Sequence, residues 1–370
     1  MKVLGIESSC DECAAAIVED GTKVLSNVIN TQIPFHAPFN GVVPEIASRK
    51  HTEWIYGVAQ EALSRAGLKP QDVDAVAAAN RPGLLGSLLV GLSFAKAFAW
   101  ARDIPFIAVD HMMAHLYASQ LSMEAPPAYP FLGLLVSGGH SIICRADAFD
   151  NITVLGATID DAAGEAFDKV AKHYQFGYPG GAIIDRMAYS GDSEAFRFPM
   201  PRLQEKAHFH EKALPHNMGG HRYDVSYSGL KNAVINQLDQ FRVKKETATK
   251  PEDIAASFQK TAVEILLRAL LNAAEDTGLD TIVAGGGVAA NSYLRKRLAE
   301  HQNLRCIFPP AEFCGDNGAM VAGIGYHYLA RGDRSPLNTT ASARVEGFKK
   351  NTVKKYSPIS RHSAIIGYRE

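Results

Sequence analysis

Two histidines stand four residues apart in this chain, at His111 and His115. Because a helix turns once every ~3.6 residues, side chains at this spacing lie on one face, where two imidazoles can bind a divalent metal ion. Two unrelated buried histidines would give the same spacing. The apolar strand expected at residues 106–110, directly before the pair, and glycine-rich loops elsewhere favour a metal site with an anion beside it.

Acidic residues are available to complete such a site. Asp316 stands at the start of a predicted helix, where its ordinary role would be to cap the helix N-terminus. A carboxylate beside two histidines would instead give a three-ligand site with coordination positions open for a substrate. Asp161, Glu165 and Asp168 share one predicted helix face. A cationic or hydroxyl-bearing group is expected to meet them, unless they form a solvated first turn.

Four loops of small residues stand at the boundaries of predicted strands and helices. Glycine has no Cβ, so backbone N–H groups in such loops can approach an anion, and helix N-termini favour negative charge. Four of them in one chain predict a nucleotide or phosphate site. None continues into the Gly-Lys-Ser/Thr of a Walker A loop, and none gives a full GxGxxG after a strand, which disfavours a Rossmann site. The loops are residues 137–140, 178–181, 285–288 and 314–318.

The elements that would position these residues repeat one pattern. Three strands begin the chain, with Asp20-Gly21 as a hairpin turn, and the same strand–loop–strand pattern returns after residue 130. This weak duplication, followed each time by helices, predicts a two-lobed α/β protein. The expected strands are 2–7, 14–19, 23–29, 74–79, 106–110, 131–136, 141–145, 152–156 and 280–284, and the expected helices are 44–66, 84–101, 160–174, 182–189, 251–278, 291–301 and 316–330.

Composition narrows the class of protein. The chain has 370 residues, 46% of them hydrophobic and 21% charged, which is typical of a globular protein large enough for two lobes. The formal net charge of −1 provides no overall basic field, so nucleic-acid binding would need a local patch such as residues 295–297. The N-terminus lacks the long apolar core of a signal peptide, and residues 84–101 suggest a packed helix rather than a membrane span.

The cysteines and the polar segments carry weaker signals. Five scattered cysteines fit a reducing cytoplasm better than a disulfide scaffold. Cys10 and Cys13 form a CxxC that could be redox-active or bind a metal, but no second CxxC completes a zinc site. Residues 202–224, with four histidines, and residues 346–370, which are basic, show little apolar periodicity. We expect a solvated loop and a disordered tail there.

Together these motifs resemble the tRNA threonylcarbamoyladenosine synthesis family, which comprises bacterial TsaD and its archaeal and eukaryotic relatives. The resemblance runs from residue 1 to about residue 340 and depends on the order of the motifs as well as on their content. The motifs are ESSCDE at 7–12, PGL at 82–84, HxxxH at 111–115, VSGGH at 136–140, GEAFDK at 164–169, YPGG at 178–181, SGLK at 228–231, GGGVAAN at 285–291 and DNGAM at 316–320.

The resemblance implies a two-lobed actin-like (ASKHA) fold with duplicated RNase H-like cores. It implies transfer of the threonylcarbamoyl group from threonylcarbamoyl-adenylate to N6 of adenosine 37, next to the anticodon, in tRNAs that read ANN codons. His111, His115 and Asp316 would hold one divalent metal ion, with Fe²⁺ favoured over Zn²⁺. Asp11 and Glu12 match acids near the reacting centre. The adenylate would be bound by Leu135, Val136, Ser137, Gly138, Gly139, Asp168, Gly181, Asp185 and Asn291.

The same resemblance implies partners and an organisation into lobes. The partners are tRNA, a TsaB-like paralogue and a TsaE-like ATPase, in the cytoplasm and without a membrane. The first lobe is expected at residues 1–120, completed by a C-terminal helix at 316–345. The second is expected at 121–315, with an insertion near 202–224, and the tail follows at 346–370.

Three other functions are compatible with parts of the sequence. Paired histidines also suggest a zinc metalloprotease, but Met112 follows His111 where H-E-x-x-H has the glutamate that acts as general base. A small-molecule kinase of the same fold would transfer phosphate from ATP and needs no histidine pair. A non-catalytic assembly subunit would use the helix at 84–101 as its docking face.

Overall fold

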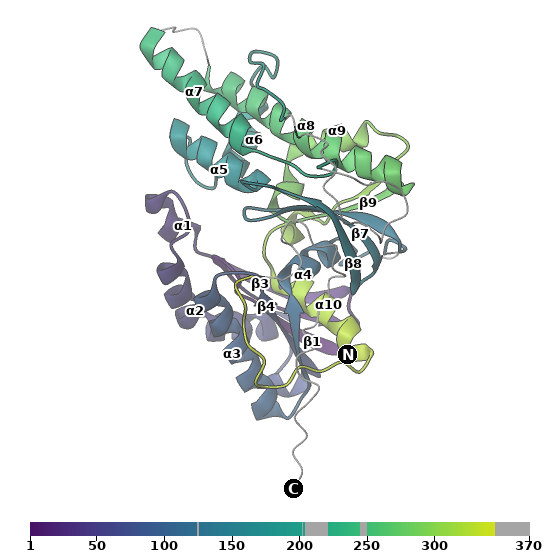
Figure 1. The fold of residues 1–370 in the computed structure, drawn as a ribbon. Coiled ribbons are helices and arrows are strands. Elements are labelled where there is room, and N and C mark those ends of the chain that lie inside the picture. The colour runs from purple at the N-terminus through teal and green to yellow at the C-terminus, as the bar shows by residue number, and fades with distance from the viewer. Residues whose placement is uncertain (124–125, 202, 204–220, 245–249, 345–370) are drawn as a thin grey trace. The chain divides into compact units, whose positions relative to one another are not determined.

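Two five-stranded sheets with one shared order of strands form the framework of the fold (Figure 1). The first sheet has the order β3-β2-β1-β4-β5, and the second, read in the corresponding direction, has the order β8-β7-β6-β9-β10. The predicted α/β fold with duplicated cores is therefore confirmed. The structure is a computed structural model, and it describes residues 1–123, 126–201, 203, 221–244 and 250–344.

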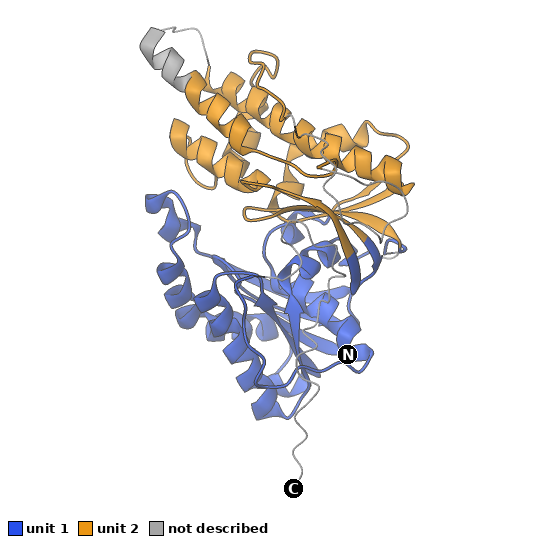
Figure 2. Cartoon of the chain, viewed as in Figure 1, with its two compact units in different colours: residues 1–129, 146–152, 309–370 blue, residues 130–145, 153–308 orange. Residues whose placement is uncertain are grey.

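The chain divides into two compact units (Figure 2). The first unit comprises Met1–Tyr129, Ala146–Ile152 and the chain from Pro309 onward, and the second comprises Pro130–Arg145 and Thr153–Phe308. The first sheet lies within the first unit. The second sheet belongs to the second unit, apart from the ends of β7 and β8 that meet in their hairpin.

The sheet of the first unit mixes antiparallel and parallel strands. β1 pairs antiparallel with β2 and parallel with β4, and β4 pairs parallel with β5. The carboxyl ends of these three parallel strands therefore share one edge, where ligands of α/β proteins commonly bind. The strands are β1 (Lys2–Glu7), β2 (Glu12–Glu19), β3 (Lys23–Thr31), β4 (Ala75–Arg81) and β5 (Phe106–Asp110).

Helices cover both faces of this sheet. Leu4 and Ile6 of β1 point toward the helix pair α2 and α3, with which they form an apolar core. Successive side chains of a strand point to opposite faces, so Gly5 faces the other side, where α10 packs. The helices are α1 (Ile33–His36), α2 (Pro44–Arg65), α3 (Leu85–Arg102), α4 (His111–Tyr117) and α10 (Gly318–Ala330).

The close approach of α10 to the sheet depends on two glycines. A Cβ on Gly5 would lie 2.2 Å from the carbonyl oxygen of Gly318, and a Cβ on Gly318 would lie 2.6 Å from the amide nitrogen of Ala16. No side chain fits at such distances, so the backbones of β1, β2 and α10 touch directly. This contact fixes the start of α10, and with it the position of Asp316, two residues earlier.

The second unit repeats the arrangement around its own sheet. β6 pairs parallel with β9, and β9 pairs parallel with β10. In register, Leu135 faces Gly285, so the two glycine-containing loops that follow β6 and β9 begin side by side. The strands are β6 (Phe131–Val136), β7 (Ser141–Ala148), β8 (Asn151–Ala157), β9 (Thr281–Gly285) and β10 (Arg305–Ile307).

One large apolar cluster holds the helices of the second unit against its sheet. The long helix α8 contributes most to it, with Phe258 and Leu266 among its buried side chains, and Phe167 of α5 packs edge-to-face on Phe258. The helices are α5 (Ala163–Tyr174), α6 (Gly180–Ala188), α7 (Ser228–Lys244), α8 (Pro251–Thr277) and α9 (Ser292–Ala299).

The structure corrects several predicted elements. α7 and β10 were not expected, and α5 begins at Ala163 rather than at residue 160. The carboxylate of Asp160 accepts hydrogen bonds from the backbone N–H groups of Tyr227 and Ser228, at the start of α7, so it does not begin its own helix. The predicted loop at 202–224 lies outside the described residues except for 203 and 221–224, and the predicted tail at 346–370 lies wholly outside them.

Residues 84–101, expected to form a packed helix, are almost coextensive with α3, whose Leu88, Leu92 and Ala95 are buried. Across the described part of the chain, no helix combines the length and apolar character needed to cross a lipid bilayer.

Candidate metal centre and nucleotide loops

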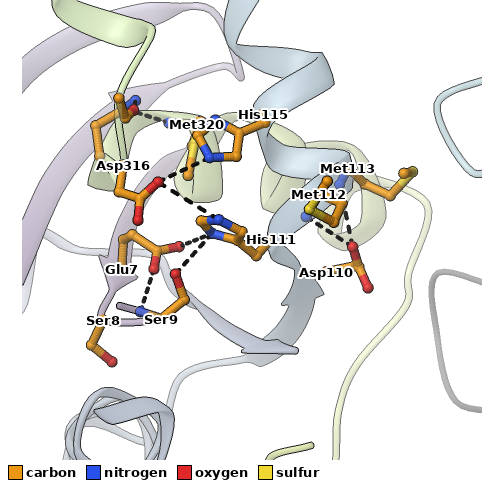
Figure 3. Close-up of polar contacts among 12 residues, drawn as sticks. Glu7, Ser8, Ser9, Asp110, His111, Met112, Met113, His115, Asp316 and Met320 are labelled. Carbon is orange, nitrogen blue, oxygen red and sulfur yellow. Dashed lines mark hydrogen bonds and ion pairs between the residues drawn. The ribbon is translucent and has the colours of Figure 1, made fainter. Parts of the chain in front are cut away.

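The histidine pair lies on α4, which begins at the residue directly after β5. Asp110 ends β5 and caps α4, because its carboxylate accepts hydrogen bonds from the backbone N–H groups of Met112 and Met113, at 2.9 and 3.3 Å. One turn of helix then separates His111 from His115. Their ring centroids lie 4.5 Å apart with the ring planes at 80°, so both imidazoles face the same place, as the spacing predicts (Figure 3).

Asp316 meets the pair from the loop before α10. Its ordinary role as a helix cap is taken by Asn317, whose side chain accepts a hydrogen bond from the backbone N–H of Met320. The Oδ1 atom of Asp316 lies 2.9 Å from Nε2 of His115 and 3.6 Å from Nε2 of His111. One ligand atom from each of the three side chains falls within 4.8 Å of the others (Figure 3). This group could bind a metal ion.

Glu7 and Ser9 hold the other nitrogen of His111. Oε2 of Glu7 lies 2.9 Å from Nδ1 of His111, and the hydroxyl oxygen of Ser9 lies 3.1 Å from the same atom (Figure 3). A carboxylate only accepts hydrogen bonds, so Nδ1 of His111 carries a proton that it donates to Glu7, and Nε2 is the nitrogen directed toward Asp316. Carboxylate–histidine contacts of this kind orient metal-binding imidazoles. The side chain of Glu7 is fully buried.

The charges around the histidines also fit a cation. Burial lowers the pKa of His111, but the carboxylates of Glu7 and Asp316 outweigh this and raise the pKa to about 9. Burial, and then the carboxylates of Asp316 and Asp11, raise the pKa of Glu12 well above its usual range. Several acids thus converge on one partly buried place, an arrangement that a divalent ion stabilises. Two imidazoles and a carboxylate are ligands that zinc and ferrous iron accept, with positions left for substrate.

Glu7 and Ser9 were not singled out individually from the sequence, and a mutation of Glu7 tests their role. A Glu7→Gln variant keeps an oxygen beside Nδ1 of His111 but removes the charge. We expect divalent metal to bind about 10- to 100-fold more weakly, the range seen for such outer partners of a metal site. Competition of Co²⁺ binding against a chelator measures this. Glu19→Gln, at the far end of β2 with its side chain 28% exposed, is the matched control, and equal affinities of the two variants would contradict the prediction.

Asp11 and Glu12 lie in the loop after β1 and at the start of β2. Asp11 is 8% exposed, and its backbone oxygen accepts from the N–H of Gln32. Oε1 of Glu12 accepts a hydrogen bond from the hydroxyl of Thr31, at 3.3 Å. The effect of Asp316 on the pKa of Glu12 places both acids near the histidine group.

The CxxC does not act as a thiolate pair in this environment. None of the five cysteines, all of which lie among the described residues, forms a disulfide. Burial, followed by the negative charge of Glu7, raises the pKa of Cys13 to about 12. Burial and Asp11 raise that of Cys10 well above its ordinary value. Reactive and metal-binding cysteines typically have a lowered pKa, so the raised values disfavour a redox or metal role for this CxxC.

In the second unit, the loop after β6 presents open backbone. Leu135 and Val136 are buried in the strand, whereas Gly138 and Gly139 are exposed, and a Cβ on either would meet nothing within 4 Å. The carbonyl oxygen of Ser137 accepts from the N–H of Gly164 at 3.2 Å, which joins this loop to the start of α5. The loop therefore has the free space and the exposed amides that an anion needs.

The other predicted nucleotide residues connect α5, α6 and α9. A carboxylate oxygen of Asp168 accepts from the backbone N–H of Gly180 at 2.7 Å, next to Gly181. The carboxylate of Asp185 accepts from the N–H and the hydroxyl of Ser292. Asn291 is 7% exposed and caps α9. These three side chains thus hold the loops of the second unit together, a structural role that sequence reasoning did not foresee.

Cations do meet Asp161 and Glu165, although Asp161 lies before α5 rather than on the helix face predicted for it. Lys169 contacts Asp161 at 2.6 Å and Glu165 at 2.8 Å, and Lys231 contacts Asp161 at 2.8 Å. Burial raises the pKa of Asp161, but hydrogen bonds from the two lysines outweigh it and lower the pKa. Asp168 is directed to Gly180 instead, so the three acids do not act as one group.

Comparison with known proteins decides the family. The family model described as "TsaD: tRNA N6-adenosine threonylcarbamoyltransferase" matches residues 23–323. The chain belongs to the TsaD family. A TsaD protein of Treponema denticola is 64% identical over 350 residues, which cover 95% of this chain and 99% of that relative, and one of Treponema pallidum is 56% identical over 95% of each. Both are named tRNA N6-adenosine threonylcarbamoyltransferase, so this TsaD-family chain is a transferase that modifies tRNA.

A solved structure supports the fold. Component A of (R)-2-hydroxyglutaryl-CoA dehydratase from Acidaminococcus fermentans superposes with a TM-score of 0.51 at 14% identity, covering 89% of this chain and 99% of that one. Identity this low shows the fold alone, which is the actin-like one. The comparisons support neither the metalloprotease nor the kinase alternative for this TsaD-family chain.

Proposed function

We propose that the chain transfers the threonylcarbamoyl group of threonylcarbamoyl-adenylate to N6 of adenosine 37 in tRNAs that read ANN codons. The observation that carries the proposal is the group of His111, His115 and Asp316, within 4.8 Å of one another, in a chain of the TsaD family. Those three side chains hold one divalent metal ion, with Fe²⁺ preferred over Zn²⁺. When bound, the metal supplies Lewis-acid polarisation of carbamoyl or carboxylate oxygens of the donor.

The second unit binds the adenylate. The amides of Gly138 and Gly139 donate to its phosphate, since a Cβ on either glycine would meet nothing within 4 Å. Ser137 closes this loop, because its N–H donates to the carbonyl oxygen of His140. Leu135 and Val136 fix the loop to the sheet. Asp168, Gly181, Asp185 and Asn291 border the same site. Asp168 accepts from the N–H of Gly180, Asp185 from that of Ser292 and Asn291 from that of Leu294, and these contacts keep the loops rigid before the substrate arrives.

The chain's own acids accept the proton of the reaction. N6 of adenosine is a weak nucleophile, so holding it against the mixed anhydride supplies much of the rate. As N6 bonds to the carbonyl carbon, the bond to the phosphate oxygen breaks, AMP leaves and N6 loses a proton. Asp11 or Glu12 takes that proton. Burial and neighbouring carboxylates raise the pKa of Glu12, which brings this group closer to the range where a carboxylate is an effective base.

Transfer RNA is the acceptor, and it is held by local positive charge. The basic residues of α9 serve this role less well than the sequence indicates. Arg295 stacks on Phe308 at 4.7 Å, and Arg297 pairs with Glu264 at 2.6 Å. Only Lys296 of that group is exposed. The phosphate contacts make binding of tRNA weaken steeply with salt.

A TsaB-like paralogue docks on an exposed apolar stripe of α3, and a TsaE-like ATPase completes the cytoplasmic assembly. Leu85, Leu89 and Trp100 lie along one side of the helix with 48%, 45% and 75% of their surface exposed. Small residues, Ser93 and Ala97, continue the same stripe and let another backbone approach closely. Exposed apolar stripes of this kind mark protein interfaces.

Mutation of the stripe tests the docking. A Leu89→Glu variant places a charge where the paralogue would exclude water, and we expect its affinity for the paralogue to fall by about 100-fold, as for a central interface residue. Lys69→Glu, at an exposed position before η2 (Pro70–Asp72), places the same side chain outside the stripe, with an even larger change of charge. Analytical ultracentrifugation of each variant with the paralogue gives both affinities. Unchanged binding by Leu89→Glu would remove α3 from the interface.

The proposed reaction is tested by reconstitution. The protein is incubated with unmodified tRNA, threonine, bicarbonate, ATP and the companion proteins, and the digested tRNA is analysed by nucleoside mass spectrometry. We expect threonylcarbamoyladenosine in tRNAs that read ANN codons and not in others. Formation of the nucleoside without this chain, or its absence from the complete mixture, would contradict the proposal.

A further inference from the structure

The two strands that lead to the metal centre end in opposite charges. Arg81 is the last residue of β4 and Asp110 the last of β5, and the two are partners in the register of this parallel pair. Nε of Arg81 lies 3.3 Å from Oδ2 of Asp110. The side chain of Asp110 is fully buried and that of Arg81 is 15% exposed. This ion pair is more buried than surface pairs such as Arg65–Glu61, so loss of one partner leaves the other charge shielded from water.

Asp110 performs two tasks at once. One carboxylate oxygen, Oδ1, accepts from the N–H groups of Met112 and Met113 and so caps α4. The other, Oδ2, faces Arg81. The plane of the carboxylate is therefore set from both sides, and α4 begins in a direction that depends on it. The first residue of that helix is His111, and one turn later comes His115.

We propose that Arg81 is a positioning residue for the metal centre, acting through Asp110 on the helix that carries both histidines. The inference rests on the proposed function, in which His111, His115 and Asp316 hold the metal. Arg81 holds the cap that sets where the two Nε2 atoms point.

The consequence of losing Arg81 follows from burial. Without the guanidinium, the carboxylate of Asp110 is a buried charge that lacks this partner, and such a charge turns toward water or draws water in. Either movement removes the acceptor from Met112 and Met113 and releases the first turn of α4. The histidines then have to be brought together by the metal itself, so metal affinity falls before the fold is lost.

Three variants test the pair through metal binding rather than through activity. Arg81→Met removes the charge and keeps the bulk of the side chain. Asp110→Asn keeps an oxygen that caps α4 and removes the charge that Arg81 faces. The double variant combines both. Arg222→Met, which breaks the Arg222–Asp276 pair in the second unit, is the control. Affinity for Co²⁺ and Zn²⁺ is measured by chelator competition, and melting of the chelator-treated protein reports the fold.

We expect each single variant to bind metal about 10-fold or more weakly, the effect typical of a group that orients a metal ligand, and Arg222→Met to bind like the parent. The double variant should bind no more weakly than Arg81→Met, because the effects of two residues that act as one pair are not additive. Parent-like affinity of both single variants, or additive losses in the double variant, would overturn the inference. If Arg81→Met does not fold, Asp110→Asn alone decides: weaker metal binding supports the inference, and parent-like binding overturns it.

A His115→Ala variant, measured alongside, distinguishes failure of the proposed metal group from failure of the positioning role of Arg81. If it keeps the metal, the proposed metal group is wrong whatever the Arg81 variants do. If it loses the metal while both single variants of the Arg81–Asp110 pair bind like the parent, only the positioning role fails.

Discussion

A His115→Ala variant is expected to lose tightly bound metal and, with it, at least about 100-fold of its tRNA modification rate. Outer partners of a metal site change affinity by about 10- to 100-fold, and a direct ligand should exceed that range. Without His115 only His111 and Asp316 remain, with Nε2 and Oδ1 3.6 Å apart, and two ligands are too few to hold an ion against water. Elemental analysis and nucleoside mass spectrometry measure the two losses.

The variant also removes a buried ring, so its controls must distinguish loss of a metal ligand from loss of the folded structure. His115→Gln fills much of the same volume and should lose the metal equally. His301→Ala, after the end of α9 in the second unit, removes an imidazole remote in sequence from the histidine pair and should keep both metal and activity. Full metal content in His115→Ala and His115→Gln would exclude this residue as a ligand.

A Gly286→Ala variant is expected to lower both the stability of the second unit and its affinity for AMP. The backbone of Gly286 has φ of +91°, and a Cβ there would lie 2.3 Å from the carbonyl oxygen of Val136. Backbone strain costs about 1–3 kcal/mol and the clash with fixed backbone a similar amount, so unfolding should become easier by about 2–6 kcal/mol. The loop after β6 must also move, so binding of AMP should weaken by more than about 10-fold.

The neighbouring glycine is a matched control for this prediction. A Cβ on Gly287 would meet nothing within 4 Å, so Gly287→Ala should change the free energy of unfolding by less than about 0.5 kcal/mol. Urea denaturation and calorimetric titration with AMP give both quantities for each variant. Equal stabilities of the two alanine variants would show that the contact between β9 and β6 is looser than described.

The sequence allowed the framework to be predicted because hydrophobic periodicity is strong there. β1, β5 and β6 have the predicted bounds, and the helix expected at 251–278 is α8. β10 was missed because it has three residues and is half exposed, which gives no pattern. α7 was missed because its sequence is mostly polar and its first turn is fixed by Asp160, a residue far away in the chain.

The candidate metal centre was predictable in part. The spacing of His111 and His115 was enough to place both rings on one face. Whether Asp316 or Asn317 caps α10 could not be decided from adjacent residues with similar capping preference, and the structure assigns the cap to Asn317. Glu7 and Arg81 act across strands, through contacts that depend on the order β1-β4-β5. No local pattern carries that information.

The central claim is that His111, His115 and Asp316 hold one divalent metal ion, and anomalous diffraction from crystals of the purified protein tests it most directly. Data collected at the iron and zinc absorption edges locate and identify any such ion. We expect one strong peak about 2.0–2.2 Å from both Nε2 atoms and from a carboxylate oxygen of Asp316. A peak held by other residues, or none at this group in protein that modifies tRNA, would contradict it.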